Sequence, residues 1–313
     1  MIKVRIECTA YNQAPYIRKC LEGFVMQKTN FKFVAVVHDD ASTDGTAEII
    51  REFAEKYPDI IKPFFETENQ YSKNTLRHCL YKIEEQYPAR YKAICEGDDY
   101  WTDPYKLQRQ VDFLDSHPDY SICSHMVGEL YQETGEIIHR SRESDIEYSL
   151  LDAACGRHYF QTLSVVFRAD LVTPEIKAKH RIWQDVVNVY TLLKFGKGFC
   201  FKEEMGVYRI HGGGVWSRTS IDQRAAWDFR LRQSIYDTEQ TAVAALGLVW
   251  CFCKPTSRLW LIKNHAYTVP ALRTIGKSFG FFTAAGIFLK KFILDENVNM
   301  DSFLENHRKD LDV

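Results

Sequence analysis

Short β-rich runs alternate with helical patterns over the first part of the 313-residue sequence. This alternation is typical of a sheet whose strands are joined by crossover helices. The composition is that of a folded protein, since 45% of the residues are hydrophobic and 26% are charged. These proportions exclude disordered, collagen-like and small disulfide-rich classes. The sequence therefore predicts an α/β protein with a Rossmann-like sheet flanked by helices, long enough for about two domains.

The first elements follow one another in regular order. Asn12 is expected to cap a helix that has Pro15 in its first turn. Phe33–Val37 is a continuous apolar run, which favours a strand buried on both faces. The predicted strands are Ile2–Cys8, Phe33–Val37, Ile60–Phe65 and Tyr91–Cys95, and the predicted helices end near Met26, Tyr57 and Tyr87.

The pattern changes after Cys95. We expect a helix over Pro104–Ser116 and then a β-hairpin, because Glu133-Thr134-Gly135-Glu136 has the composition of a tight turn. Further predicted elements are the strands Tyr159–Arg168 and Gly198–Ile210, the helix Asp185–Phe195, and mostly helical structure from Arg224 onward. The predicted domains are residues 1–220 and a mainly helical region, residues 221–313.

Acidic residues gather at predicted strand ends, where open α/β sheets bind ligands. Asp39 and Asp40 directly follow the most apolar strand. Adjacent carboxylates repel each other unless something binds to them, although turn and helix-cap chemistry accounts for the neighbouring Asp44. The segment Glu96-Gly97-Asp98-Asp99 has three carboxylates on one predicted loop. Such oxygen ligands suit Mg²⁺ or Mn²⁺ bridged to phosphate oxygens.

A third group combines Gln184-Asp185 with a later loop. Three consecutive glycines, Gly212–Gly214, follow Arg209 and His211, and glycines in series indicate a loop that a ligand can approach closely. An arginine and a histidine beside that loop would meet a diphosphate and its metal. The structural alternatives are an ordinary helix cap for Asp185 and a surface position for His211.

Together these motifs resemble family 2 glycosyltransferases of the GT-A fold. The resemblance covers roughly Met1 to Trp216. It rests on Thr9-Ala10-Tyr11-Asn12, His38-Asp39-Asp40-Ala41-Ser42-Thr43-Asp44-Gly45-Thr46, Glu96-Gly97-Asp98-Asp99-Tyr100-Trp101 with Pro104, Lys106 and Leu107, and Tyr208-Arg209-Ile210-His211. It implies a mixed sheet flanked by helices, with a nucleotide-sugar half (residues 1–100) and an acceptor and catalytic half (residues 101–220).

The resemblance also implies roles for individual residues. Asp39 or Asp40 would contact the nucleobase, and Asp98 and Asp99 would form the DXD element that binds the ribose and the metal-diphosphate. The residues implied to bind the nucleotide sugar are Thr9, Tyr11, Asn12, Asp39, Asp40 and Asp98. Asp99 and His211 would bind Mn²⁺ or Mg²⁺, and Glu96 and Arg209 would support the diphosphate or the metal. Asp185 would be the catalytic base. Two departures are Glu96, where an aspartate is usual, and Gln184, where a glutamate usually precedes the base.

The function implied is inverting sugar transfer from a nucleotide-diphosphate sugar, most often UDP-linked, to a hydroxyl of a glycan or lipid-linked acceptor, as in cell-surface polysaccharide synthesis. Two alternatives remain open. A sugar nucleotidyltransferase would have a Gly-rich basic loop after the first strand, which Thr9–Ala14 does not provide. A non-catalytic protein that binds a nucleotide sugar or a membrane partner would have lost turnover through Glu96 and Gln184.

Charge is distributed unevenly along the chain. The formal net charge is −2, which argues against a basic nucleic-acid binder. Between Trp250 and Leu294, however, seven basic residues occur without any Asp or Glu. Interleaved with apolar residues, they suit helices on an anionic membrane surface, or lysines that snorkel from a packed helical subdomain. Nine scattered cysteines and no signal-like leader predict a cytoplasmic location. Attachment through the basic segment would be peripheral, on the inner face of the cell membrane. The pattern does not define the oligomeric state.

Overall fold

The computed structural model describes residues 1–73, 75–157, 160–214, 218–254, 258–294 and 296–311. The chain divides into two compact units. Unit 1 contains Met1–Tyr148, Tyr159–Pro174 and Phe195–Gly212; unit 2 contains Ser149–His158, Glu175–Lys194 and Gly213–Val313. Unit 2 thus includes two segments that precede residue 220.

Unit 1 is built on a mixed sheet that has ten strands within the described residues. The central order is β3-β2-β1-β4-β9-β6-β10-β5, with β7 beside β6 and β8 beside β10. The strands are β1 Ile2–Ala10, β2 Phe33–Asp39, β3 Ile61–Phe65, β4 Ala89–Ile94, β5 Tyr100–Trp101, β6 Tyr120–Tyr131, β7 Glu136–Ile138, β8 Ile146–Tyr148, β9 Val166–Arg168 and β10 Lys197–Ile210. β1, β2, β3 and β4 are parallel, whereas β9 runs antiparallel to β4 and β6.

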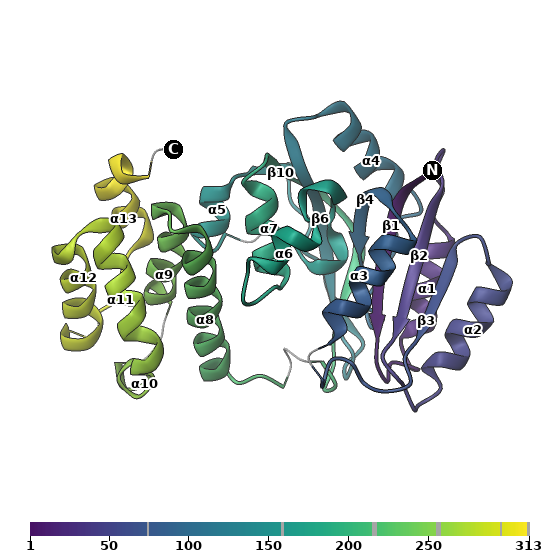
Figure 1. Cartoon of the computed structure of the whole chain (residues 1–313), viewed down its shortest axis with the longest axis horizontal. Coiled ribbons are helices and arrows are strands. Elements are labelled where there is room, and N and C mark those ends of the chain that lie inside the picture. Colours follow the sequence, from purple (N-terminus) through teal and green to yellow (C-terminus); the bar gives the residue numbers. More distant parts are fainter. Residues whose placement is uncertain (74, 158–159, 215–217, 255–257, 295, 312–313) are drawn as a thin grey trace. The chain divides into compact units, whose positions relative to one another are not determined.

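Helices cover both faces of this sheet (Figure 1). One face packs against α1 (Ile17–Val25), α2 (Thr46–Lys56) and α4 (Lys106–Ser116), which together with the sheet form the main core. The opposite face packs against α3 (Leu76–Gln86), where Val34 and Val36 of β2 contact Ile83. Because successive side chains of a strand point to opposite faces, β2 is buried on both sides, as its apolar sequence predicts.

The predicted α/β alternation and the hairpin of β6 and β7 are confirmed. The strand predicted over Tyr159–Arg168 is wrong over most of its described length, because only Val166–Arg168 forms a strand and Thr162–Ser164 forms a 3₁₀ turn. The Ser164 hydroxyl donates to the Gln161 carbonyl at 2.7 Å, a local bond that competes with strand pairing. Tyr159 itself lies outside the described residues.

Unit 2 is helical. Its helices are α5 Leu150–Ala154, α7 Asp185–Leu193, α8 Ile221–Glu239, α9 Ala242–Cys253, α10 Arg258–Lys263, α11 His265–Phe279, α12 Phe281–Phe288 and α13 Met300–His307; α6 (Pro174–Ala178) begins at the boundary. α9 packs between α8, α11 and α5, and nearly all of its apolar side chains are buried. Among the described residues, none of the helices combines the length and apolarity needed to cross a bilayer.

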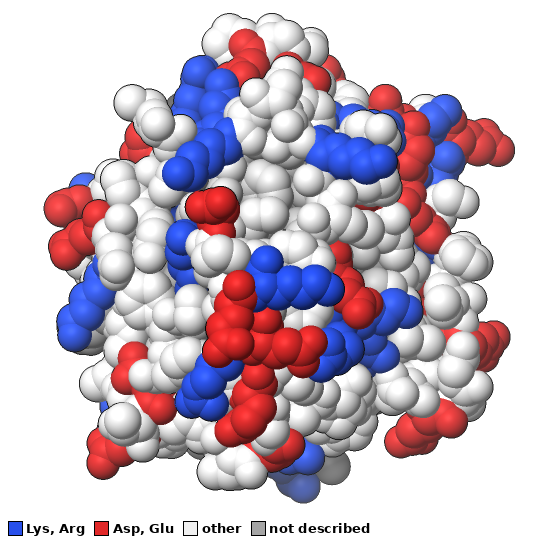
Figure 2. Space-filling model, turned by 90° about the vertical axis from the view of Figure 1, so that its right-hand side faces the viewer, with Lys and Arg blue, Asp and Glu red and all other residues white. Residues whose placement is uncertain are grey.

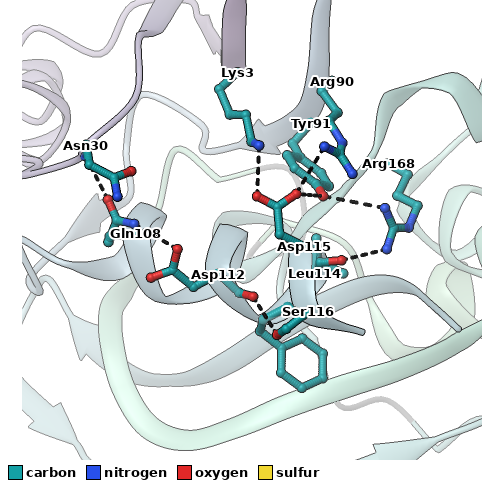
Figure 3. Close-up of polar contacts among 11 residues, drawn as sticks. Lys3, Asn30, Arg90, Tyr91, Gln108, Asp112, Leu114, Asp115, Ser116 and Arg168 are labelled. Atoms are coloured by element: carbon teal, nitrogen blue, oxygen red, sulfur yellow. Dashed lines mark hydrogen bonds and ion pairs between the residues drawn. The ribbon is translucent and has the colours of Figure 1, made fainter. Parts of the chain in front are cut away.

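The amino ends of β1 and β4 are fastened to the end of α4 by a polar cluster around Asp115 (Figure 3). Its carboxylate accepts from Lys3 and from the Tyr91 hydroxyl, both at 2.8 Å, and pairs with Arg90 at 3.2 Å. Although partial burial opposes ionisation, the bonds from Lys3 and Tyr91 lower the pKa of Asp115. The guanidinium of Arg168 donates to the Leu114 carbonyl at 2.7 Å, which satisfies one carbonyl at the carboxyl end of α4.

Surface charges of both signs are intermixed on the face that carries α2 and β3 (Figure 2). Pairs such as Arg18 with Glu52 and Arg51 with Glu48 lie on or against α2. Neither sign dominates this face, in agreement with the near-neutral net charge. It has none of the extended basic character of a nucleic-acid binding surface.

A buried lysine lies inside the main core. The Lys106 side chain is fully buried; its ammonium donates to Gln110 Oε1 at 2.7 Å and lies 4.0 Å from the centre of the Trp101 ring. The Gln110 amide in turn donates to the Ser164 carbonyl at 2.9 Å. Burial lowers the pKa of Lys106 to about 7, because a low dielectric disfavours the charged amine.

Replacing Lys106 by Met should remove a pH dependence of stability. An unfolded lysine has a pKa of about 10.4, so between about pH 7 and 10 the unfolded chain holds a proton that the folded chain has released. The free energy of unfolding therefore gains a contribution that rises with pH, by at most about 1.4 kcal/mol per unit. Urea unfolding of wild type and Lys106→Met at about pH 7 and 8.5 should show the smaller rise in the variant.

Cysteine thiols also titrate in this pH range. They occur in both wild type and Lys106→Met, so their contribution to the pH dependence of unfolding cancels in the comparison. Lys32→Met, at an exposed lysine, should retain the wild-type pH dependence. Equal dependences for wild type and Lys106→Met would mean that Lys106 keeps an ordinary lysine pKa.

Candidate functional site

Three loops meet at the carboxyl edge of the parallel strands. In the register of the sheet, Ala10 at the end of β1 lies beside Asp39 at the end of β2. The loop after β4 continues along β1, since the Gly97 N–H donates to the Thr9 carbonyl at 3.1 Å. Parallel pairing therefore brings the motifs around residues 9–12, 38–46 and 96–99 to one place in unit 1.

Gly97 permits the close approach of two of these loops. A Cβ atom added at this position would lie 2.3 Å from Gln13 Oε1 and 2.8 Å from Ile17 Cδ1. Both distances are shorter than any normal contact, so a larger residue would displace the ends of the Gln13 and Ile17 side chains. The glycine thus leaves room for these two side chains beside the loop that carries Asp98 and Asp99.

The loops after β1 and β2 are bonded to each other. The Asn12 side chain accepts from the Thr43 N–H at 2.8 Å, and the Asn12 N–H donates to the Ser42 hydroxyl at 2.9 Å. The expectation that Asn12 caps the first helix is wrong, because α1 begins at Ile17 and Asn12 has a left-handed backbone with φ of 51°. Asparagine tolerates this conformation better than most residues. Tyr11, beside it, is 49% exposed.

Asp39 and Asp40 are both buried but differ in their partners. The two oxygens of Asp40 accept from the N–H groups of Gln70 and Tyr71 at 2.6 and 3.0 Å. One oxygen of Asp39 accepts from the Ser42 N–H at 3.2 Å, while the other is buried without a hydrogen-bond partner among the described residues. Asp40 therefore holds the following loop in place, and Asp39 retains an oxygen for a ligand.

Asp98 and Asp99 contact the end of β10. Asp98 Oδ2 lies 3.0 Å from His211 Nε2. Asp99 Oδ1 accepts from the Arg209 N–H at 2.8 Å, and the Arg209 Nε–H donates to the Asp98 carbonyl at 2.7 Å. Two motifs that are more than a hundred residues apart in sequence thus form one polar cluster. Half-buried Glu96 contributes its carbonyl, which accepts from the Asp99 N–H at 3.1 Å.

The electrostatics of this cluster favour a cation. Burial raises the pKa of the Asp99 carboxyl well above the ordinary aspartate range, and the charges of Asp98 and Glu96 add to the rise. Asp99 Oδ2 is buried with no hydrogen-bond partner among the described residues, and an atom of this kind is available to an ordered water or a ligand. Carboxylate and imidazole donors suit Mn²⁺. Asp98, Asp99 and His211 thus offer donor types that suit a divalent metal, and one pair of them, Asp98 with His211, is in contact.

Asp185 belongs to unit 2, whereas the polar cluster belongs to unit 1. It is the first residue of α7 and is exposed, and its Oδ1 accepts from the Val186 N–H at 2.7 Å. Desolvation by neighbouring atoms raises the pKa of Asp185, although the Val186 N–H opposes the rise. The preceding Gln184 accepts from the Trp227 indole N–H at 3.0 Å.

Three residues of the cluster were not predicted. The Tyr16 ring lies 4.7 Å from the His211 ring and 4.7 Å from the Arg209 guanidinium carbon. Gln132 accepts from the same guanidinium, and Gln13 Oε1 is buried without a hydrogen-bond partner among the described residues. Gln13 and Tyr16 closely follow the motif at residues 9–12, and this proximity is the only feature of the sequence that points to them. Gln132 lies in a turn after β6, and no feature of the sequence points to a role for it in the site.

Comparisons with known proteins agree with this architecture. The model of the family described as Glycosyl transferase family 2 matches residues 8–164. A Mycobacterium tuberculosis protein of uncharacterized function is 36% identical over 224 residues, covering 71% of this chain and 62% of the relative. The chain thus matches less than two thirds of that relative's length.

Two solved structures with a similar fold contain a bound nucleotide sugar. The crystal structure of S. aureus TarS residues 1–349 in complex with UDP-GlcNAc has a TM-score of 0.60 and 17% identity, covering 99% of this chain and 93% of that chain. The mannosyltransferase PcManGT from Pyrobaculum calidifontis, in complex with GDP-Man and Mn²⁺, has a TM-score of 0.50 and 16% identity, covering 98% of this chain and 79% of that chain. At these identities the likeness concerns the fold. The mixed sheet, the family match and these neighbours together establish that the chain belongs to glycosyl transferase family 2 and has the GT-A fold.

Proposed function

We propose that the protein transfers a sugar from a nucleotide-diphosphate donor, such as a UDP-sugar, to a hydroxyl of a glycan or lipid-linked acceptor, with inversion at the anomeric carbon. The observation that carries this proposal is the buried, unpartnered oxygen of Asp99 beside the Asp98–His211 pair. The family match and the nucleotide-sugar ligands named for TarS and PcManGT support it.

The donor nucleotide is proposed to lie over the carboxyl ends of β1 and β2. Asp39 is the better candidate for the nucleobase, because it retains a free oxygen where Asp40 has none. Thr9 and Asn12 line the same edge through the bonds that join the loops, and exposed Tyr11 is available to stack on the base. Asp98 would bind the ribose.

Asp99 and His211 would hold the metal together with Asp98, while Arg209 and Glu96 would support it. Mn²⁺ or Mg²⁺, when bound there, would neutralise charge on the diphosphate as it leaves. Arg209 places its guanidinium against the Tyr16 and Tyr100 rings, with carbon-to-centroid distances of 4.7 and 5.4 Å. This packing holds a cation beside the Asp98 carbonyl, where it would support the charge of a diphosphate bound at Asp98 and Asp99.

Asp185 is proposed as the base that removes the acceptor proton while the hydroxyl attacks from the face opposite the nucleotide. Its raised pKa makes the carboxylate a stronger base than an ordinary aspartate. Its exposure allows an acceptor to reach it. Because the attack is direct, no covalent sugar-enzyme intermediate is required.

We also propose that unit 2 binds an anionic membrane surface at the cytoplasmic face of the cell. Of the seven basic residues between Trp250 and Leu294, Lys254 pairs with Asp228, and Lys291 is buried and bonded to Asn297. The exposed ones are Lys263, Arg273, Lys277 and Lys290; the Arg258 side chain lies outside the described residues. The charged side chains of this segment that remain exposed and described are therefore all positive.

Large apolar side chains lie exposed in the same segment. Phe281 is 76% exposed and Phe282 88% exposed at the start of α12, and Phe288, Leu289, Ile293 and Leu294 are 46–53% exposed. The other aromatic residues of the segment, such as Phe252 and Trp260, pack in the core of unit 2. Exposed apolar residues flanked by lysines match the chemistry of an anionic lipid surface.

Replacing Asp99 by Asn should reduce transfer by about 100-fold or more, because charge stabilisation at a leaving group amounts to several kcal/mol. Nucleotide release would be measured with Mn²⁺, a panel of nucleotide sugars and acceptor extracts. EDTA should abolish wild-type release, and added Mn²⁺ should restore it. Asp112→Asn, on the exposed face of α4, is the control. Normal Mn²⁺-dependent nucleotide release by Asp99→Asn would contradict the assignment of Asp99 to the metal. If the wild-type protein binds the donor but shows no turnover, the non-catalytic alternative is favoured.

Replacing Asp185 by Asn should lower kcat by roughly 10²- to 10⁴-fold while leaving the KM for the donor nearly unchanged. The wild-type kcat should fall as the pH drops through the raised pKa of Asp185, since protonation removes the base. Asp222→Asn, in the first turn of α8, matches the chemistry and the helical position and should behave as wild type. Near-normal turnover by Asp185→Asn would place the base elsewhere.

The double variant Phe281→Ser, Phe282→Ser should bind anionic liposomes at least about tenfold more weakly, because burying each large apolar side chain stabilises by roughly 1.5–3 kcal/mol. Flotation with anionic and zwitterionic liposomes measures this, and high salt should weaken the wild-type interaction. Ile221→Ser, at another exposed apolar residue, is the control. Unchanged flotation of the double variant would rule out this surface and leave a protein partner or a second copy as its occupant.

A further inference from the structure

A second group of metal-ligating side chains lies in unit 1, apart from the Asp98–Asp99 cluster. His38 at the end of β2, Glu66 just after β3 and Cys79 in α3 place one ligand atom each within 4.8 Å of one another. His38 Nε2 is 3.2 Å from Glu66 Oε1. The imidazole is 1% exposed, whereas Glu66 and Cys79 are half-buried, so that an ion can enter from solvent.

Strand geometry separates this group from the nucleotide site. Asp39 and His38 are consecutive residues of β2, so their side chains leave opposite faces of the sheet. His38 lies on the same face of β2 as Val34 and Val36, because alternate residues of a strand share a face. Val34 and Val36 pack against α3. Glu66 follows Phe64, the register partner of His38, by two residues and thus extends the same face of β3. Cys79 precedes Ile83 by one helical turn and lies on the side of α3 that meets the sheet.

The three side chains are positioned by the backbone. The Glu66 N–H donates to the Asp39 carbonyl at 2.9 Å, which continues the ladder between β2 and β3. His38 is held between β1 and β3 by its register with Thr9 and Phe64. Rigid elements, and not surface loops alone, therefore converge on one point, as a preorganised metal site requires.

We propose that His38, Glu66 and Cys79 bind a thiophilic divalent metal, Zn²⁺, as a structural site on the α3 face of the sheet. Imidazole, thiolate and carboxylate are the ligand types of protein zinc sites, and three of them with one water complete a tetrahedron. The ligand atoms of such a site lie about 3.5 Å apart, so the observed arrangement needs shifts of only roughly an ångström. The Asp98–Asp99 cluster, with oxygen and imidazole donors, has no thiolate.

The ion would fasten α3 at its amino-terminal end. The other end is already attached by charge pairs, because Glu84 is 3.1 Å from Lys92 of β4 and 3.7 Å from Arg5 of β1. Two attachment points would fix the helix across β1, β2 and β3. The segment between β3 and α3, which holds Asp40 through Gln70 and Tyr71, would then be restrained at both ends.

Co²⁺ titration of the intact, reduced protein tests this site, since cobalt bound to thiolate absorbs strongly in the near ultraviolet and cobalt bound to oxygen ligands does not. Wild type should show this absorption with one Co²⁺ per chain, and Zn²⁺ should displace it. Cys79→Ser should abolish it. Cys253→Ser, at the other half-buried cysteine, should leave it unchanged.

Glu66→Gln provides a second variant that retains the thiol. It should keep the absorption but bind Co²⁺ at least about tenfold more weakly, since even outer-shell changes weaken metal sites roughly 10- to 100-fold. Circular dichroism of each variant identifies any that fails to fold. Absence of the absorption in wild type, its persistence in folded Cys79→Ser, or unchanged affinity in Glu66→Gln overturns the proposal. Because the readout involves no sugar transfer, it is independent of the proposed activity.

Discussion

The parallel pairing of β1 with both β2 and β4 is the constraint on which the candidate site depends. It places the ends of three strands at one edge, where Ala10 lies beside Asp39 and the Gly97 N–H bonds to the Thr9 carbonyl. Residue 97 has no side chain, which leaves room for the ends of the Gln13 and Ile17 side chains. The long strand β10 then adds Arg209 and His211 from the far side of the sheet order, through its pairing with β6 and β5.

This edge concentrates groups that the fold leaves unsatisfied. Gln13 Oε1, Asp39 Oδ1 and Asp99 Oδ2 are buried without hydrogen-bond partners among the described residues, and all lie in or beside the three loops. Each such group costs free energy in the absence of a ligand. Other buried polar atoms of unit 1, such as His125 Nε2 and Glu203 Oε2, also have no hydrogen-bond partner among the described residues. The Asp115 cluster at the opposite ends of β1 and β4, by contrast, is fully bonded. A charged ligand bound at this edge would satisfy the three atoms that lie there.

The basic residues between Trp250 and Leu294 fall into two groups in the structure. Lys254 and Lys291 are used within unit 2, by an ion pair and by buried hydrogen bonds. Lys263, Arg273, Lys277 and Lys290 remain at the surface, and Phe281 and Phe282 do likewise. A packed subdomain thus accounts for Lys254 and Lys291, and the proposed lipid-facing surface involves only the residues that remain exposed.

The order of strands and helices, the α/β class and the acidic motifs at strand ends could be predicted from the sequence, because periodicity and turn chemistry are local properties. The short strand β5, the 3₁₀ turn at Thr162–Ser164 and the role of Asn12 could not, since they depend on partners distant in sequence. Only the tertiary structure distinguished Asp39 from Asp40, joined Asp98 to His211 and set His38 beside Cys79. Each of these features depends on which polar groups keep a free atom after the strands have paired and the helices have covered the sheet. A local sequence pattern does not contain that information, because the partners are distant in sequence.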